Sequence, residues 1–253
     1  MLDPRDLRAT AATFGVAEAQ VRRDHLIGHT LAALADLDIP DLVFLGGTAL
    51  SWTHLSQGRL SEDVDLMAPE RRSAASTVER QIPRRLRREF PGSSWDPGLL
   101  GVRSISPARL VTPDELVVRI QLLDAGRQGW HEMPTERRTL VRRYRDVPET
   151  VLRVPTLAAF AAMKTLAWID RHAARDLYDL AGLATIGALT PEAADLFAHA
   201  TGRPLAAHDF VRLPADWDTA LRHQTGNLPS ARACLDAVRD GYAESLGARW
   251  QRA

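Results

Sequence analysis

Two adjacent glycines, Gly46 and Gly47, constrain the local fold of this chain more than any other feature of its sequence. A fully apolar run, Leu42–Leu45, comes directly before them and follows the helix-breaking Pro40, as is typical of a short buried strand. Residues 48–58 then carry a helical pattern that ends in a glycine. The sequence therefore predicts a strand that turns at the glycine pair directly into a helix.

A pair of aspartates follows, in a second stretch that resembles a strand. In "EDVDLMAP", Asp63 and Asp65 alternate with apolar residues before Pro69. Residues two apart in a strand point to the same face, so the two carboxylates are expected side by side. Such like charges repel unless a cation lies between them, and Mg²⁺ suits one or two carboxylates completed by water and phosphate oxygens. The alternative is a solvent-facing strand edge.

The glycine turn and the aspartates together favour chemistry on phosphates. Backbone N–H groups from Thr48 to Ser51, at the start of the expected helix, are suited to binding phosphate. Arg59 and Ser61, just before the aspartates, offer further donors. A cradle for a triphosphate beside a metal supplies the two requirements of phosphoryl transfer.

The rest of the chain predicts an α/β domain followed by a helical one. Residues 1–150 are expected to form a small mixed sheet with helices, and 151–253 a second domain with helical spacing only. In the first domain we expect helices over 3–37 with a break near Phe14–Gly15, an arginine-rich helix over about 70–89, and strands near 100–106 and 115–123.

Composition places the chain among ordinary globular proteins, with 45% hydrophobic and 25% charged residues. The lone cysteine, Cys234, fits a reducing cytoplasm. No signal peptide is expected because the first residues are charged and lack an apolar core, and no membrane span is expected because the most apolar segment, 154–168, is short and contains Lys164. Zero net charge argues against a general nucleic-acid coat protein. Two arginine-rich segments, 71–88 and 136–145, are either solvated helix faces or RNA contacts.

Two segments resemble a known family. "GGTALS" followed by "RLSEDVDL" is similar to the first motif of AbiEii/AbiGii-type nucleotidyltransferase toxins, which include the MenT toxins and have the DNA polymerase β type of catalytic fold. Leu157–Leu183 resembles the family's later segment, in which a lysine on one helix precedes an Arg-Asp-x-x-Asp-Leu run. The lysine here is Lys164, the single lysine among 32 basic residues.

The resemblance implies a role for each matching position. Gly46, Gly47 and Ser51 would lie near the nucleotide phosphates, and Asp63 and Asp65 would be the metal ligands. Lys164 would contact the nucleoside triphosphate, and an aspartate of the "RDLYD" run would complete the active site from the helical domain.

Helix geometry does not decide which aspartate of the "RDLYD" run completes the active site. In one continuous helix Arg171 and Arg175 fall within about 20° of Lys164, Asp179 at about 60° and Asp176 at about 120°, which favours Asp179. A helix break within "DRHAARD" instead places Asp176 in a new first turn, so both remain candidates.

The resemblance also has a gap, because polymerase β-type enzymes commonly carry a third carboxylate on a later strand. The corresponding position here is Gln121, and Asp124 or Glu115 are the possible substitutes. Either one metal suffices or the chain is a weak catalyst. Histidines, His54, His131 and His172 among them, show no metal-ligand spacing, so we expect surface or core-edge roles for them.

The first functional hypothesis is a Mg²⁺-dependent nucleotidyltransferase that moves NMP from an NTP to an acceptor and releases pyrophosphate. The resemblance implies a toxin whose acceptor is the 3′ end of tRNA, with translation and growth blocked, and a cognate antitoxin protein as partner. A second hypothesis has a small-molecule or protein hydroxyl as acceptor. A third, supported mainly by Gln121, is a nucleotide-binding regulatory module without turnover.

Overall fold

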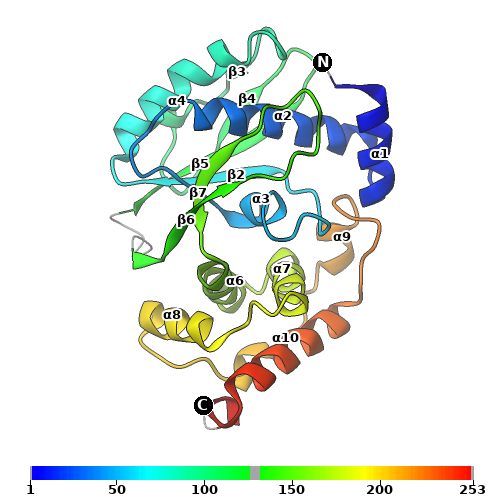
Figure 1. Cartoon of the computed structure of the whole chain (residues 1–253), viewed down its shortest axis with the longest axis vertical. Helices are drawn as coiled ribbons and strands as arrows, with labels where there is room; N and C mark the ends of the chain where they lie inside the picture. Colours follow the sequence, from blue (N-terminus) through cyan, green and yellow to red (C-terminus); the bar gives the residue numbers. More distant parts are fainter. Residues whose placement is uncertain (1, 126–131, 252–253) are drawn as a thin grey trace. The chain divides into compact units, whose positions relative to one another are not determined.

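The computed structural model describes residues 2–125 and 132–251, and the chain divides into two compact units, Met1–Val154 and Pro155–Ala253. We refer to them as the N-terminal and the C-terminal unit. The N-terminal unit is mixed α/β and the C-terminal unit has helices only among its described elements after β7, which confirms the predicted fold class (Figure 1). Among the described residues, no helix has the length and apolarity needed to cross a membrane.

The N-terminal unit is built on one sheet of seven strands in the order β3-β4-β5-β2-β1-β7-β6. Strand β2 lies at its centre, antiparallel to β1 and parallel to β5, and β1 is also parallel to β7. The strands are β1 (Val43–Leu45), β2 (Asp63–Ala68), β3 (Ser94–Trp95), β4 (Ala108–Val111), β5 (Val117–Asp124), β6 (Thr135–Thr139) and β7 (Val151–Pro155).

Helices pack against this sheet where the strands are apolar. On β2 and β5 the apolar side chains at even-numbered positions, such as Val64 and Ile120, are buried, whereas Asp63, Asp65 and Arg119 alternate with them. Helices α2 and α4 contact each other and β5, and α3 contacts β1 and β2 (Figure 1). The helices are α1 (Pro4–Phe14), α2 (Glu18–Ala35), α3 (Gly46–Ser51) and α4 (Arg71–Arg85).

Local capping explains the break between the first two helices. Asp3 accepts a hydrogen bond from the Arg5 backbone N–H at 2.7 Å, and Pro4 occupies the first turn of α1. Gly15, with φ 63°, ends α1 in the left-handed conformation. The predicted interruption near Phe14–Gly15 is therefore confirmed.

Two of the predicted elements are wrong in extent or kind. Helix α3 ends at Ser51 rather than at Gly58, because the Trp52 carbonyl accepts a hydrogen bond from the Val141 N–H instead of continuing the helix. Residues 100–106 form no strand, and a 3-10 turn occupies Leu99–Gly101. Here the Arg71 guanidinium donates hydrogen bonds to the carbonyls of Leu99 and Val102, so these carbonyls do not pair with a strand.

The C-terminal unit packs around large aromatic side chains. Trp168, Phe197, Phe210 and Tyr242 are fully buried, α6 packs against α7 and α8, and α7 packs against α10. Its elements are α6 (Leu157–Arg171), α7 (Ala174–Thr185), α8 (Pro191–Thr201), the 3-10 helix η3 (Ala207–Phe210), α9 (Trp217–Leu221), α10 (Ala231–Leu246) and α11 (Ala248–Gln251).

Candidate active site

The glycine turn lies directly against one of the two aspartates. Strand β1 passes into α3 at Gly46, whose φ of +81° places it in the left-handed region. A Cβ atom on Gly46 would lie 2.1 Å from Oδ2 of Asp65, far closer than any real contact. Glycine is therefore required both by the backbone conformation and by the position of the Asp65 carboxylate.

Strand pairing fixes the aspartates beside this turn. Leu45, the last residue of β1, lies opposite Asp65 on β2, and Asp63 occupies the first position of the same strand. The Thr48 hydroxyl on α3 donates to the Asp63 carbonyl. The sheet thus brings together the glycine turn and both carboxylates, which the sequence placed in separate segments.

The position expected for a third carboxylate is occupied by Gln121. In the parallel pairing of β2 with β5, Gln121 lies opposite Asp65 and Arg119 lies opposite Asp63. The Gln121 amide nitrogen donates a hydrogen bond to the Ser104 carbonyl at 3.2 Å. The amide oxygen of Gln121 is then a candidate metal ligand on the same face of the sheet as Asp65.

Neither substitute carboxylate reaches this position. Asp124 lies opposite Ala68 at the far end of β2, three residues from Gln121, so alternation also turns its side chain to the other face. Glu115 lies in the turn before β5, with φ 65°. Within the described ranges, no third acidic, histidine or cysteine side chain lies close enough to Asp63 and Asp65 to share a metal ion with them.

Arg119 compensates the charge of the aspartate pair. Its Nε and Nη2 atoms lie 2.6 and 3.2 Å from the two Asp63 carboxylate oxygens. The bidentate contact with Asp63 raises the pKa of the Arg119 guanidinium. Two carboxylates and an amide oxygen fit one hard divalent ion that completes its shell with water and phosphate oxygens.

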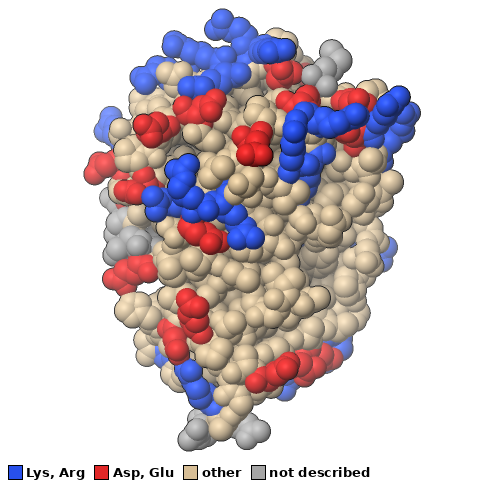
Figure 2. Space-filling view, viewed as in Figure 1, with Lys and Arg blue, Asp and Glu red and all other residues tan. Residues whose placement is uncertain are grey.

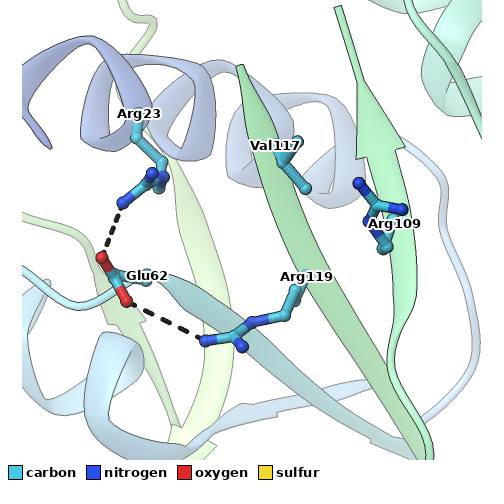
Figure 3. Close-up of a pocket in the computed structure, with 5 residues that line it drawn as sticks. All are labelled: Arg23, Glu62, Arg109, Val117 and Arg119. Atoms are coloured by element: carbon cyan, nitrogen blue, oxygen red, sulfur yellow. Dashed lines mark hydrogen bonds and ion pairs between the residues drawn. The ribbon is translucent and has the colours of Figure 1, made fainter. Parts of the chain in front are cut away.

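A polar pocket of about 290 Å³ is lined in part by Glu62 and by Arg119, which pairs with Asp63. Figure 3 shows Arg23, Arg109 and Arg119 along its wall, with Glu62 between Arg23 and Arg119. Arg23 lies 2.6 Å from Glu62, and Arg119 reaches both Glu62 and Asp63. With three arginines and one glutamate the pocket is electropositive, and a phosphate is the group that best fits it.

The Ser51 hydroxyl has a structural use. Ser51 is buried and donates to the Arg59 carbonyl at 2.8 Å, while Arg143 donates to the Ser51 hydroxyl and carbonyl at 2.8 and 2.6 Å. Arg143 also pairs with the fully buried Asp24. Ser51 thus anchors the end of α3, and Arg59 and Ser61, which we expected to act as donors, are themselves buried.

In the C-terminal unit, one buried cluster contains Lys164 and both candidate aspartates. The Lys164 Nζ atom lies 3.1 Å from Oδ1 of Asp176 and 2.6 Å from Oδ2 of Asp179. The helix breaks at His172, which has φ 50°, so Asp176 enters the first turn of α7 and Asp179 follows one turn later. The alternative of one continuous helix is therefore wrong and the break is confirmed. The break brings both candidate aspartates to the same lysine.

Arg171 completes the cluster. Its Nε and Nη2 atoms donate to the two Asp176 oxygens at 2.7 and 3.0 Å, and its side chain is 60% exposed, while Asp176 is fully buried. Burial by itself would raise the pKa of Asp176, but Lys164 and Arg171 hold it below its usual range. Arg175, which we expected on the same face as Lys164, is half-buried on α7.

Sequence reasoning missed a second cluster. His25 and His29 are one turn apart on α2, a spacing typical of metal ligands on a helix, and their side chains meet Asp146. Our expectation that no histidines show ligand spacing is therefore wrong for this pair. Of the other candidates, His54 is buried near Glu136, His172 ends α6, and His131 lies outside the described residues.

Comparisons with known proteins show the family and the fold. A family model described as the nucleotidyl transferase AbiEii toxin of type IV toxin–antitoxin systems matches residues 30–243. Among solved structures, the chain is similar to MenT4, a nucleotidyltransferase toxin from Mycobacterium tuberculosis H37Rv, with 21% identity over 93% of this chain and 87% of that one, and a TM-score of 0.67. It is also similar to a protein from H. pylori assigned as a nucleotidyltransferase, with 19% identity, coverage of 91% and 98%, and a TM-score of 0.52. No curated protein sequence matches the chain significantly.

Proposed function

The chain belongs to the AbiEii family of nucleotidyltransferase toxins of type IV toxin–antitoxin systems, and we propose that it is a Mg²⁺-dependent enzyme that transfers NMP from an NTP to RNA. The proposed acceptor is the 3′ end of tRNA, and its modification would block translation and growth. We propose that it acts in the cytoplasm and is neutralised by a cognate antitoxin protein. The two proposed domains, residues 1–150 and 151–253, differ from the two compact units only in residues 151–154, which lie on β7 in the N-terminal sheet.

The observation that carries this proposal is the contact of Asp65 with the glycine turn. The Asp65 carboxylate fills the space where any other residue at position 46 would carry its Cβ. A proposed metal ligand thereby lies at the start of α3, so a phosphate bound by the backbone N–H groups of Gly47 and Thr48 would lie next to a metal bound by Asp63 and Asp65. Such proximity is what phosphoryl transfer requires.

Each candidate site residue of the N-terminal unit then has a proposed role. Asp63 and Asp65 would hold the metal, with the Gln121 amide oxygen as a neutral third ligand. The bound Mg²⁺ would neutralise charge on the phosphates and help to activate the attacking hydroxyl. Arg119 would orient Asp63, and Gly46, Gly47 and Thr48 would receive the phosphates. Ser51, Arg59 and Ser61 would support this turn from within the core.

In the C-terminal unit, we propose that Lys164 contacts the triphosphate. Its role rests on the family resemblance and on its surroundings: two aspartates fix its ammonium group, so little side-chain entropy remains to be lost on binding phosphate. Asp176 and Asp179 would act by positioning Lys164. Arg171, whose side chain is mostly exposed, and Arg175 would add positive charge for the nucleotide.

Basic groups beside Asp63 support a polyanionic acceptor. The arginine pocket of Figure 3 can receive a backbone phosphate of RNA, or one of the triphosphate, next to the proposed metal ligands. Arginines of α4 and the residues after it are mostly exposed, and Figure 2 shows basic side chains gathered over one end of this helix. These basic groups favour RNA, rather than an uncharged small molecule, as the acceptor of the nucleotide.

The test is transfer of label from each of the four NTPs to total tRNA, to lysate protein and to small hydroxyl compounds. We expect labelled tRNA with the wild type and a loss of at least about 100-fold with Asp65→Asn or Lys164→Ala. Asp36→Asn, which removes an exposed carboxylate paired with Arg85, is the matched control and should retain full activity. Full transfer by Asp65→Asn would refute the site, and label in protein or small molecules alone would refute the RNA acceptor.

One observation favours a second candidate function, a nucleotide-binding module without turnover. Gln121 replaces the third carboxylate opposite Asp65, so the negative charge available for a second metal is reduced. NTP binding measured by calorimetry, without pyrophosphate release in any acceptor mixture, would support that function. A Gln121→Asp variant that gains transfer activity would show that the missing carboxylate is the cause.

A further inference from the structure

Three side chains of the N-terminal unit converge on one point that the proposed reaction does not use. His25 and His29 extend from α2, and Asp146 comes from the turn between β6 and β7. Nε2 of His25 lies 3.2 Å from Nε2 of His29 and 3.0 and 3.1 Å from the two Asp146 oxygens. Nε2 of His29 lies 3.5 Å from Oδ2 of Asp146.

Hydrogen bonding alone does not satisfy this arrangement. Two neutral imidazole nitrogens facing each other share at most one hydrogen. If His29 donates it, the lone pair of His25 faces the Asp146 carboxylate at 3.0 Å; if His25 donates it to Asp146, the lone pair of His29 faces both His25 and the carboxylate. A cation at the centre would satisfy all three groups at once.

The spacing matches a tetrahedral transition-metal site. Bonds of about 2.0 to 2.1 Å at tetrahedral angles put neighbouring ligand atoms about 3.3 to 3.4 Å apart. The separations here run from 3.0 to 3.5 Å, so the ligand atoms already lie close to the spacing that such a site requires. Two imidazoles and one carboxylate suit Zn²⁺ and ions of its class, whereas Mg²⁺ prefers oxygen ligands alone.

Packing holds the ligands in place and leaves an approach to them. His25 and His29 are buried, and their rings pack against Phe90 at 5.5 and 5.7 Å, with the Tyr144 ring 5.0 Å from His25. His25 also lines a cavity of about 500 Å³, through which an ion and a fourth, water ligand can enter.

We propose that His25, His29 and Asp146 form a Zn²⁺ site that fastens the β6–β7 connection to α2. The same two segments are joined nearby by an ion pair between Arg143 and the buried Asp24. Arg143 also donates hydrogen bonds to Ser51 at the end of α3. A metal here would stabilise the segment that anchors α3 and thereby the glycine turn at its start. This site is independent of the proposed transfer reaction.

The test is Zn²⁺ binding to the full chain after treatment with a chelator, in the absence of Mg²⁺ and NTP. Calorimetry and elemental analysis should give one equivalent of Zn²⁺ for the wild type, and Co²⁺ in its place should give the visible spectrum of a four- or five-coordinate ion. Zn²⁺ at about 100 times its Kd should raise the Tm by roughly 5 °C.

His29→Gln and Asp146→Asn should lose the bound equivalent, the Co²⁺ spectrum and the Tm rise. Asp65→Ala and the exposed His208→Gln should retain all three, which separates this site from the β2 carboxylates and from adventitious histidine binding. If His29→Gln does not fold, Asp146→Asn decides, because its side chain is 27% exposed and the change is isosteric. Wild type without one tight Zn²⁺, full binding by Asp146→Asn, or loss in Asp65→Ala would each overturn the proposal.

Discussion

Replacing Gly46 with alanine tests the geometry of the proposed site directly. The new Cβ would stand 2.1 Å from Oδ2 of Asp65, whereas real Cβ atoms essentially never approach another atom within 3.0 Å. The Asp65 carboxylate must therefore move by about 1 Å, and a misplacement of that size at a reacting centre can cost about 100-fold in rate. The backbone adds a separate cost, because a non-glycine residue in the left-handed region loses about 1 to 2 kcal/mol.

Gly202→Ala is the matched control. Gly202 has φ +72°, close to the +81° of Gly46, but nothing lies within 4 Å of the Cβ it would gain. Both variants should lose about 1 to 2 kcal/mol of unfolding free energy, measured by denaturant titration. Only Gly46→Ala should lose about 100-fold in kcat/KM for label transfer from NTP to tRNA. Equal activities of the two variants would refute the argument that the Asp65 position depends on the absence of a side chain at position 46.

Two further predictions concern burial. Asp176→Asn should cost about 3 kcal/mol of unfolding free energy because it removes the buried carboxylate that pairs with both Lys164 and Arg171 and leaves Asp179 alone to balance Lys164. Asp195→Asn, in an exposed ion pair, should cost less than about 1 kcal/mol. Because the pKa of Asp176 is lowered on folding, the loss of unfolding free energy in Asp176→Asn should be largest above a pH of about 5. It should shrink as the pH falls through the folded pKa and should be absent in acid. A loss that grew in acid would contradict the prediction. Burial raises the pKa of Cys234 to about 11, so its alkylation at pH 8 should be at least about 100-fold slower in the native than in the unfolded chain, and equal rates would show that the thiol is not buried.

The local elements of the site could be predicted because they depend on neighbouring residues. The apolar run before Gly46 forms β1, the glycine pair starts α3, and Asp63 and Asp65 lie on one side of β2. Periodicity and turn-forming residues carry this information without reference to the rest of the chain. The predictions failed where a distant group decided the outcome: the hydrogen bond from Val141 shortened α3, and Arg71 took the carbonyls of the expected strand near residues 100–106.

The sequence by itself determined the family, the strand–turn–helix unit, the aspartate pair and the lysine with its following aspartates. Tertiary structure decided which groups face them: Gln121 and Arg119 across from the aspartates, Asp176 and Asp179 both on Lys164, and Asp146 beside two histidines. Strand register set the contacts on β2, and the local pattern does not fix register, although a shift of one residue turns every side chain of a strand to the other face. The break at His172 set the contacts on Lys164, and the sequence had left that break as one of two alternatives.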